Sequence, residues 1–230
     1  MVFSCRDLIG RFGRISGTLL LLLFLCGAAA NTVVVTVTSA SEAKSGFRHL
    51  EPGEATALVK SLGDAAVAML SDKKLGQVEK IRQFRHLLNQ SFAMRGIARF
   101  ALGRYWRRAN YTQRRRYLKL FEDYIVNSYA ARFSNYDGEK FIVQGERIDD
   151  RGNAIVTTRI QRPSGEPVVV LWHLRERLGA VLIVDVVVEG ISMSLTQRSD
   201  FAASVRTAGG DLDAFLDTLE AKVRNIRPAH

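Results

Sequence analysis

The longest helical pattern in the chain lies between Asn110 and Phe133. Its apolar residues recur three and four positions apart, which places them on one face of a helix. Most charged residues fall on the other face. The apolar face is rich in aromatic side chains, including Phe121, Tyr124 and Tyr129. A face of this width needs a broad partner, and we expect the strands that follow the helix to provide it.

Four strand patterns follow, over Glu139–Arg147, Ala154–Arg162, Pro167–Arg175 and Ala180–Val188. Short links that contain glycine join them, which is typical of an antiparallel meander. Apolar and polar residues alternate clearly in the second strand, whereas the third and fourth are apolar on both faces. Strands of that kind are covered on both sides, or one face lines an apolar cavity.

Further helical patterns flank these elements. They cover Pro52–Leu70, Leu75–Phe92, Met94–Leu102, Ser194–Ala208 and Leu212–Asn225. Asn and Asp at the starts of helices accept hydrogen bonds from first-turn amides, so we expect N-caps at Asn110 and Asp211. Together the patterns predict an α+β fold, in which several helices pack on a bent antiparallel sheet of about four strands and an apolar pocket lies between sheet and helices.

The N-terminus has the three-part pattern of a secretory signal. Three arginines precede an apolar run, Leu19–Ala30, which ends in small residues suited to cleavage. A second apolar stretch, Val33–Val37, lengthens the segment to roughly a membrane span, so an uncleaved anchor is the alternative. Cys26 also allows a lipoprotein signal, although Leu25 stands where a small residue is expected.

These readings all export the remainder of the chain, and for a bacterial-type signal the destination is the periplasm. We assign residues 1–43 to a signal peptide, or an N-terminal anchor, with a short linker. Residues 44–230 form a single domain, since this length suits one hydrophobic core.

The chain is basic, with 33 Lys and Arg against 23 Asp and Glu and a formal net charge of +10. Such a surface suits nucleic acid, anionic lipid head groups or an acidic protein, and export argues against nucleic acid. The segment Gly103–Arg108 places aromatic residues among arginines, which fits either a contact patch or packed rings with solvated arginines. The arginines expected to contact a partner or a head group are Arg104, Arg107, Arg108, Arg114 and Arg115.

Motifs of catalysis and of cofactor binding are missing from the sequence. The four histidines have no metal-ligand spacing, and Gly190–Ser194 lacks the second glycine of a nucleophile elbow. Asp185, the lone charge inside the fourth strand, suits a base of raised pKa, or a carboxylate that pairs with an arginine or caps a sheet edge. We expect a protein that is not an enzyme and that needs no cofactor and no metal.

Three parts of the chain carry a resemblance to a known family. They are Phe100–Trp106 with Gln113-Arg114 and Phe121–Tyr124, then Tyr136–Glu139, and finally Val188–Met193 with Arg198–Phe201 and Gly209–Leu212. The family that they resemble is MlaC, the periplasmic phospholipid carriers of the outer-membrane lipid-asymmetry, or toluene-tolerance, transport system. The resemblance covers roughly Ala55 to Val223. The long signal departs from the family pattern, as does Asn110-Tyr111, where the family often has Thr-Pro.

The resemblance implies a carrier that holds the acyl chains of a phospholipid between sheet and helices. It also implies exchange of that lipid with an inner-membrane ABC transporter complex and an outer-membrane lipoprotein complex, which maintains outer-membrane lipid asymmetry. A related branch is linked to hopanoid synthesis, so the cargo could be another lipid. Two alternatives remain, an adaptor whose aromatic face is only core and an enzyme that uses Asp185 on a similar cone-shaped fold. We expect a monomer that binds no nucleic acid.

The residues expected to line the pocket are inferred from the apolar pattern, and each has an alternative as ordinary core. They are Phe100, Tyr105, Phe121, Tyr124, Ile125, Tyr129, Val156, Val170, Trp172, Val184, Val186 and Ile191.

Overall fold

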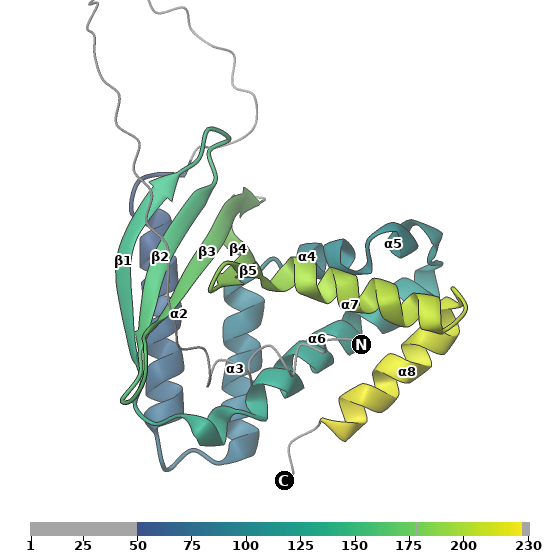
Figure 1. The fold of residues 1–230 in the computed structure, drawn as a ribbon, viewed down its shortest axis with the longest axis horizontal. Coiled ribbons are helices and arrows are strands. Elements are labelled where there is room, and N and C mark those ends of the chain that lie inside the picture. Colours follow the sequence, from purple (N-terminus) through teal and green to yellow (C-terminus); the bar gives the residue numbers. More distant parts are fainter. Residues whose placement is uncertain (1–49, 178, 227–230) are drawn as a thin grey trace, which may run out of the picture. The chain divides into compact units, whose positions relative to one another are not determined.

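The computed structural model describes residues 50–177 and 179–226 (Figure 1). Contacts group these described residues into one compact unit. The predicted signal or anchor, residues 1–43, lies outside the described residues. Since both hydrophobic clusters described below lie within residues 50–226, we expect this unit to fold by itself.

The sheet is an open antiparallel meander whose strands follow one another in chain order. They are β1 (Lys140–Ile148), β2 (Ala154–Gln161), β3 (Val168–Arg177), β4 (Ala180–Val188) and the short β5 (Ile191–Ser192). The register shifts between Val143 and Gly145 in β1, and again between His173 and Leu174 on β3. Bulges of this kind bend a sheet and increase its twist. The four predicted strands are thus confirmed, and β5 is an addition that the pattern did not predict.

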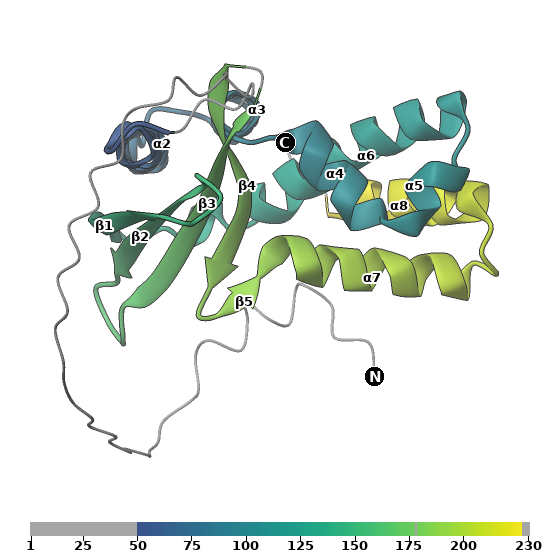
Figure 2. The ribbon, with the colours of Figure 1, turned by 90° about the horizontal axis from the view of Figure 1, so that it is seen from above.

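Helices fill the rest of the described chain (Figures 1 and 2). They are α2 (Glu54–Ser71), α3 (Gln77–Ser91), α4 (Met94–Leu102), α5 (Arg104–Arg108), α6 (Tyr111–Ala130), α7 (Met193–Thr207) and α8 (Leu212–Asn225). Helix α6 ends three residues before the predicted end at Phe133. The chain turns there through a short 3₁₀ helix, Phe133–Asn135, and the ring of Phe133 meets that of Phe84 edge-on, with centroids 5.2 Å apart.

Both predicted N-caps are confirmed. The Asn110 side chain accepts a hydrogen bond from the Gln113 amide, and the Gln113 side chain accepts one from the Asn110 amide, which completes a capping box. Asp211 accepts bonds from the amides of Asp213 and Ala214 at the start of α8. These local bonds fix where the two helices begin.

The apolar residues form two separate clusters. In the sheet cluster, α2 lies across one face of the sheet, which we call the inner face (Figure 2). The buried members of the sheet cluster are Leu50, Ala55, Val59, Ala154, Val156, Leu174 and Ile183. The helical cluster joins α4, α5, α6, α7 and α8, and its largest buried rings are Tyr117, Phe121, Phe201 and Phe215.

The expectation that the aromatic helix lies on the sheet is therefore wrong. Helix α6 buries Tyr117, Phe121 and Tyr124 against other helices, and α2 covers the sheet instead. Periodicity shows which face of a helix is apolar. It does not show which of the several apolar helix faces in this chain covers the sheet.

Candidate functional site

The structure divides the predicted pocket residues between the two clusters. Tyr105, Phe121 and Tyr124 are buried in the helical cluster, and Ile125 packs against it. Val156 is buried in the sheet cluster, with Trp172 and Val186 packed against that cluster. The other five lie within strands β3 and β4, beside Phe84 or near the surface. Val170 is buried in β3, Val184 is half-buried in β4, Tyr129 meets the ring of Phe84, and Phe100 and Ile191 are exposed.

The helical group behaves as ordinary core. The ring of Phe201 has aromatic neighbours on three sides, in Tyr117, Phe121 and Phe215, with centroids 5.4 to 6.1 Å apart. The Tyr117 hydroxyl donates a 2.8 Å hydrogen bond to the Ala98 carbonyl. Burial raises the pKa of this phenol well above its ordinary value. Rings packed so closely leave no room for a ligand, which favours the core interpretation for Phe121 and Tyr124.

The sheet group is centred on Trp172. Its ring lies 6.0 Å from that of Phe141 in β1 and 6.4 Å from that of Phe92 after α3, in edge-on arrangements. Its indole N–H donates a 2.9 Å hydrogen bond to the hydroxyl oxygen of Thr158, which is fully buried. The bond satisfies the one polar atom of the indole and fixes the plane of the ring.

The inner face of the sheet is covered less tightly than the helical cluster. In α3 only Leu88 and Ser91 are buried. The residues that are partly exposed yet packed against the sheet cluster are Leu58, Leu62, Phe92, Phe141, Val143, Trp172, Val181 and Val186. A closely packed core would bury such large apolar side chains completely, and here they are only partly buried. This partial burial occurs along the boundary between the sheet and helices α2 and α3.

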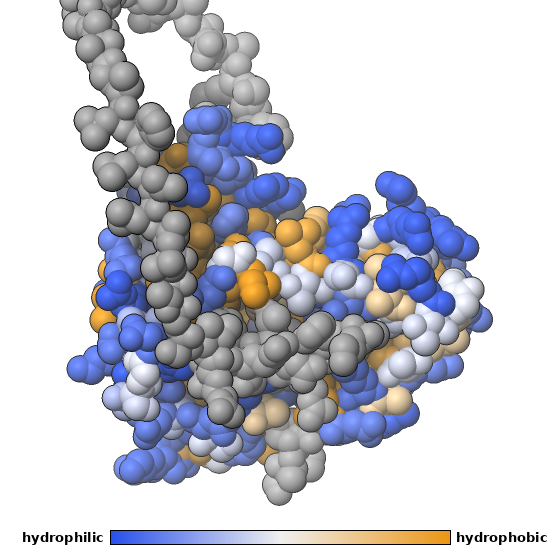
Figure 3. Space-filling view, viewed as in Figure 1, coloured by the Kyte–Doolittle hydropathy of each residue, from blue (hydrophilic) through white to orange (hydrophobic). Residues whose placement is uncertain are grey.

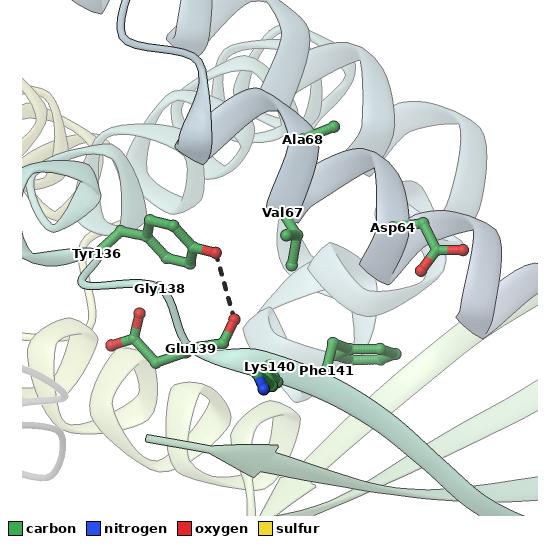
Figure 4. A pocket seen from close by; sticks show the side chains of 8 residues that line it. All are labelled: Asp64, Val67, Ala68, Tyr136, Gly138, Glu139, Lys140 and Phe141. Atoms are coloured by element: carbon green, nitrogen blue, oxygen red, sulfur yellow. Dashed lines mark hydrogen bonds between the residues drawn. The ribbon is translucent and has the colours of Figure 1, made fainter. Parts of the chain in front are cut away.

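A hollow of about 480 Å³ opens at this boundary (Figure 4). Asp64, Val67 and Ala68 of α2 line one side of it, and the segment from Tyr136 to Phe141 lines the other. Apolar Val67 and Phe141 share the hollow with the charged side chains of Asp64, Glu139 and Lys140. The hollow thus combines an apolar lining with polar groups, as small-molecule sites commonly do.

Sequence reasoning missed Phe92, Phe141 and Val67 as candidates. One signal pointed to Phe141, namely Gly63 in the interior of α2. Glycine costs about 1 kcal/mol relative to alanine in a helix, and its presence here marks a close approach. A β-carbon on Gly63 would lie 2.7 Å from Cγ of Phe141.

The predicted contact arginines differ in their surroundings. Arg114 donates a 3.1 Å bond to the Trp106 carbonyl in α5 and lies over the indole of that residue. Arg104 donates a 3.0 Å bond to the Tyr105 hydroxyl, and Arg115 lies over the ring of Tyr111. Arg107 and Arg108 are exposed. Arg116, beside them in the sequence, forms ion pairs with Asp217 and Glu220 of α8.

Asp185 serves the start of α7. Its carboxylate accepts hydrogen bonds from the Ser192 hydroxyl at 2.6 Å, the Ser194 amide at 3.0 Å and the Val186 amide at 2.9 Å. Ser192 in turn caps α7 by accepting a bond from the Leu195 amide. These bonds give Asp185 a structural role at the junction of sheet and helix.

Neither a metal site nor a membrane-spanning helix is found in the described part of the chain. Residues 50–177 and 179–226 contain no group of His, Cys, Asp or Glu side chains that could hold a metal ion. Within the same residues, the helices are too short or too polar to cross a membrane.

Comparison with known proteins places the chain in a family. The family model described as MlaC protein matches residues 60–221. The chain therefore belongs to the MlaC family, as its sequence motifs predicted.

Two relatives agree with this assignment. Toluene tolerance protein ttg2D of Pseudomonas putida is 25% identical over 126 residues, which are 55% of this chain and 59% of that protein. A phospholipid-binding protein from Ralstonia solanacearum, solved in complex with a phospholipid, is similar with a TM-score of 0.65 at 20% identity. That match covers 75% of this chain and 98% of the other. It confirms the predicted α+β fold.

Proposed function

We propose that this protein is a periplasmic carrier that holds a phospholipid between the inner face of its sheet and helices α2 and α3. Family membership and the phospholipid bound to the Ralstonia solanacearum protein support a binding protein rather than an enzyme. The observation that carries the proposal is the incompletely buried apolar boundary around Trp172 and Phe141. Phe141 belongs both to this boundary and to the lining of the hollow between α2 and β1, so the boundary and the hollow adjoin each other.

Acyl chains suit this boundary for a physical reason. Each buried methylene group contributes roughly 0.8 kcal/mol, so about ten methylenes supply roughly 8 kcal/mol without any directional contact. The side chains already packed there are apolar and half-buried, so they exchange contact with water for contact with lipid. Helix α3 has few buried residues, so a movement of this helix that admits an acyl chain would disrupt little packing.

The proposed lipid contacts follow from this placement. From the predicted set they are Val156, Val170, Trp172 and Val186, to which the structure adds Leu62, Val67, Phe92 and Phe141. A head group left at the surface would lie near Asp64, Glu139 and Lys140, which line the hollow with both signs of charge.

The setting of the carrier is proposed from the family. The basic domain would exchange lipid with an inner-membrane ABC transporter complex and an outer-membrane lipoprotein complex, and so maintain outer-membrane lipid asymmetry. A monomer suffices for such a carrier, because the boundary lies within one chain. Charge complementarity with partners would raise the rate of encounter more than the affinity.

Native mass spectrometry of residues 44–230, purified without detergent, tests the proposal. Solvent extraction and lipid analysis of the same sample identify the cargo. The expected result is about one phospholipid per protein. A hopanoid would keep the carrier and change the pathway, whereas a stable domain that stays empty after incubation with lipid vesicles would contradict the carrier proposal and favour an adaptor.

A further inference from the structure

A second hollow, of about 250 Å³, lies in the helical half of the protein, apart from the proposed lipid site. Helices α4 and α5 and the turn between them contribute Leu102, Gly103, Arg104 and Tyr105, and α7 contributes Arg198, Ala202 and Arg206. Its lining therefore contains three guanidinium groups and no carboxylate.

The three arginines keep their charges available. Among the described residues, none of Arg104, Arg198 and Arg206 forms an ion pair with an acidic side chain. By contrast, Arg116 of α6, in the same half of the protein, forms ion pairs with Asp217 and Glu220. Like charges gathered without a counter-charge repel one another, and a bound anion relieves that repulsion.

Two of these guanidinium groups are held in place by neutral neighbours. Arg104 donates a hydrogen bond to the Tyr105 hydroxyl and lies 5.0 Å from the centre of that ring. Arg198 lies 4.9 Å from the centre of the Phe100 ring and passes close to the backbone of Gly103. Such stacking orients the planar fork without neutralising it, which suits bidentate binding of phosphate oxygens.

Exposed apolar side chains belong to α4 and α7, which line the hollow, and to the start of α6. Phe100 of α4 is 39% exposed, Leu195 of α7 is 59% exposed and Tyr111 at the start of α6 is 73% exposed. Figure 3 shows hydrophilic side chains gathered over the part of the structure that contains α5. Aromatic and aliphatic groups among arginines are the composition of a surface that lies in the head-group layer of a membrane.

We propose that this hollow binds the phosphate group of an anionic phospholipid when the domain rests on a bilayer. The ligand is a lipid of the membrane surface, distinct from the cargo held under the sheet. The inference rests on the proposed carrier function and adds to it a direct contact with the bilayer in which the partner complexes lie.

Vesicle co-sedimentation of residues 44–230 tests the inference. The probes are vesicles of phosphatidylcholine alone and vesicles of equal parts phosphatidylcholine and phosphatidylglycerol. The double variant R198Q/R206Q removes two charges from the hollow. The matched control R159Q/R175Q removes two exposed charges from strands β2 and β3. The unmodified domain should bind only the anionic vesicles, and the hollow variant should bind them roughly tenfold more weakly, because each arginine near an anionic surface adds several-fold to binding.

The control variant should bind close to the level of the unmodified domain. Equal losses in both variants would show an effect of net charge alone and overturn the inference, as would equal binding to both kinds of vesicle. Thermal unfolding checks that the variants are folded, and the single variant R206Q, at the exposed end of α7, serves if the double variant is not.

Competition with inorganic phosphate separates a site from screening. Sodium phosphate should release the domain from anionic vesicles more effectively than sodium chloride at the same ionic strength. Equal release by both salts would overturn the inference. Native mass spectrometry of R198Q/R206Q should still detect the cargo lipid, so loss of vesicle binding and loss of cargo are separate results that fail separately.

Discussion

The ring of Phe141 lies directly against the backbone of Gly63. A β-carbon on Gly63 would come within 2.7 Å of Cγ of that ring and nearer still to two other ring atoms. Gly63 is buried in the middle of α2, and Phe141 contacts both the hollow and Trp172. The position of α2 on the sheet, and with it the width of the proposed lipid site, therefore depends on the absence of one methyl group.

The variant G63A should destabilise the domain by about 1–3 kcal/mol, because the added methyl group overpacks the contact with Phe141. G96A is the matched control. Gly96 also lies in a helix but is exposed, and a β-carbon there meets nothing closer than 3.8 Å. That substitution should be neutral or stabilising by up to about 1 kcal/mol. Chemical denaturation of both variants makes the comparison, and equal stabilities would mean that Phe141 yields freely.

The hydrogen bond between Trp172 and Thr158 leads to a second prediction. T158V keeps the shape of the side chain but leaves the indole N–H without its acceptor, which should cost about 1–3 kcal/mol. T157V, on the preceding residue of β2 and the opposite face of the sheet, should cost less than about 0.5 kcal/mol. A W106F background leaves Trp172 as the single tryptophan, so its emission reports unfolding and lipid entry alike. No change in its emission on addition of lipid would place the cargo elsewhere.

The sequence predicted local structure well because local signals are strong in this chain. The strand Ala180–Val188 and the helix Leu212–Asn225 agree with the structure at both ends, since glycine turns and an Asp N-cap mark their limits. The N-cap of α6 at Asn110 was predicted equally well. The end of α6 was not, because Phe133 leaves the helix to meet Phe84, and that partner is distant in the chain.

The choice of packing partner could not be predicted. Tyr117, Phe121 and Tyr124 form an apolar face that fits a sheet or a helix, and periodicity does not distinguish the two. The arginine run of α6 shows the same limit. Arg116 meets Asp217 and Glu220, about a hundred residues later in the chain, so its pairing was invisible in the local pattern. The candidate site was therefore predicted in kind, an apolar space beside the sheet, but only partly in its residues.

The buried phenol of Tyr117 should make stability depend on pH in the alkaline range. Burial raises its pKa above the ordinary tyrosine value of about 10, so the folded state keeps the proton where the unfolded state loses it. The stabilising contribution is complete below pH 10 and declines as the pH rises above that value. At neutral pH, Y117F should cost about 1 kcal/mol through the lost bond to Ala98.

The difference in unfolding free energy between the unmodified domain and Y117F should then shrink above pH 10. Denaturation series on both sides of that pH measure it. Y111F changes a phenol that is 73% exposed and should follow the unmodified domain throughout. If the difference in unfolding free energy stayed constant, Tyr117 would ionise as readily in the folded domain as in the unfolded chain, which would contradict the prediction.

The carboxylate of Asp185 should matter for stability and not for turnover of a substrate. D185A removes the acceptor of the Ser192 hydroxyl and the Ser194 amide and should destabilise the domain by about 1–3 kcal/mol. D185N retains one acceptor oxygen and should cost less. Lipid occupancy, measured by native mass spectrometry, should be unchanged in D185N. If D185N instead abolished conversion of a lipid substrate, the enzyme alternative would replace the carrier.

The two faces of the sheet provide the most direct test of where the lipid lies. Val186 pairs with Trp172 and packs on the inner face, whereas Val187 pairs with Leu171 on the outer face, and both are half-buried. V186E places a charge among the proposed acyl contacts and should abolish lipid occupancy, because a carboxylate in an apolar site is strongly unfavourable. V187E makes the same substitution one residue along the strand and should leave occupancy intact.

A second pair repeats the comparison by bulk instead of charge. V170W should fill the buried inner position beside Thr158, and V169W should extend from a position that is 37% exposed on the outer face. Native mass spectrometry gives the occupancy of each variant, and circular dichroism confirms that each is folded. Loss of lipid only in V186E and V170W places the cargo under the sheet. Loss only in the outer-face variants would move the site to the opposite face, since alternate residues of a strand point to opposite sides.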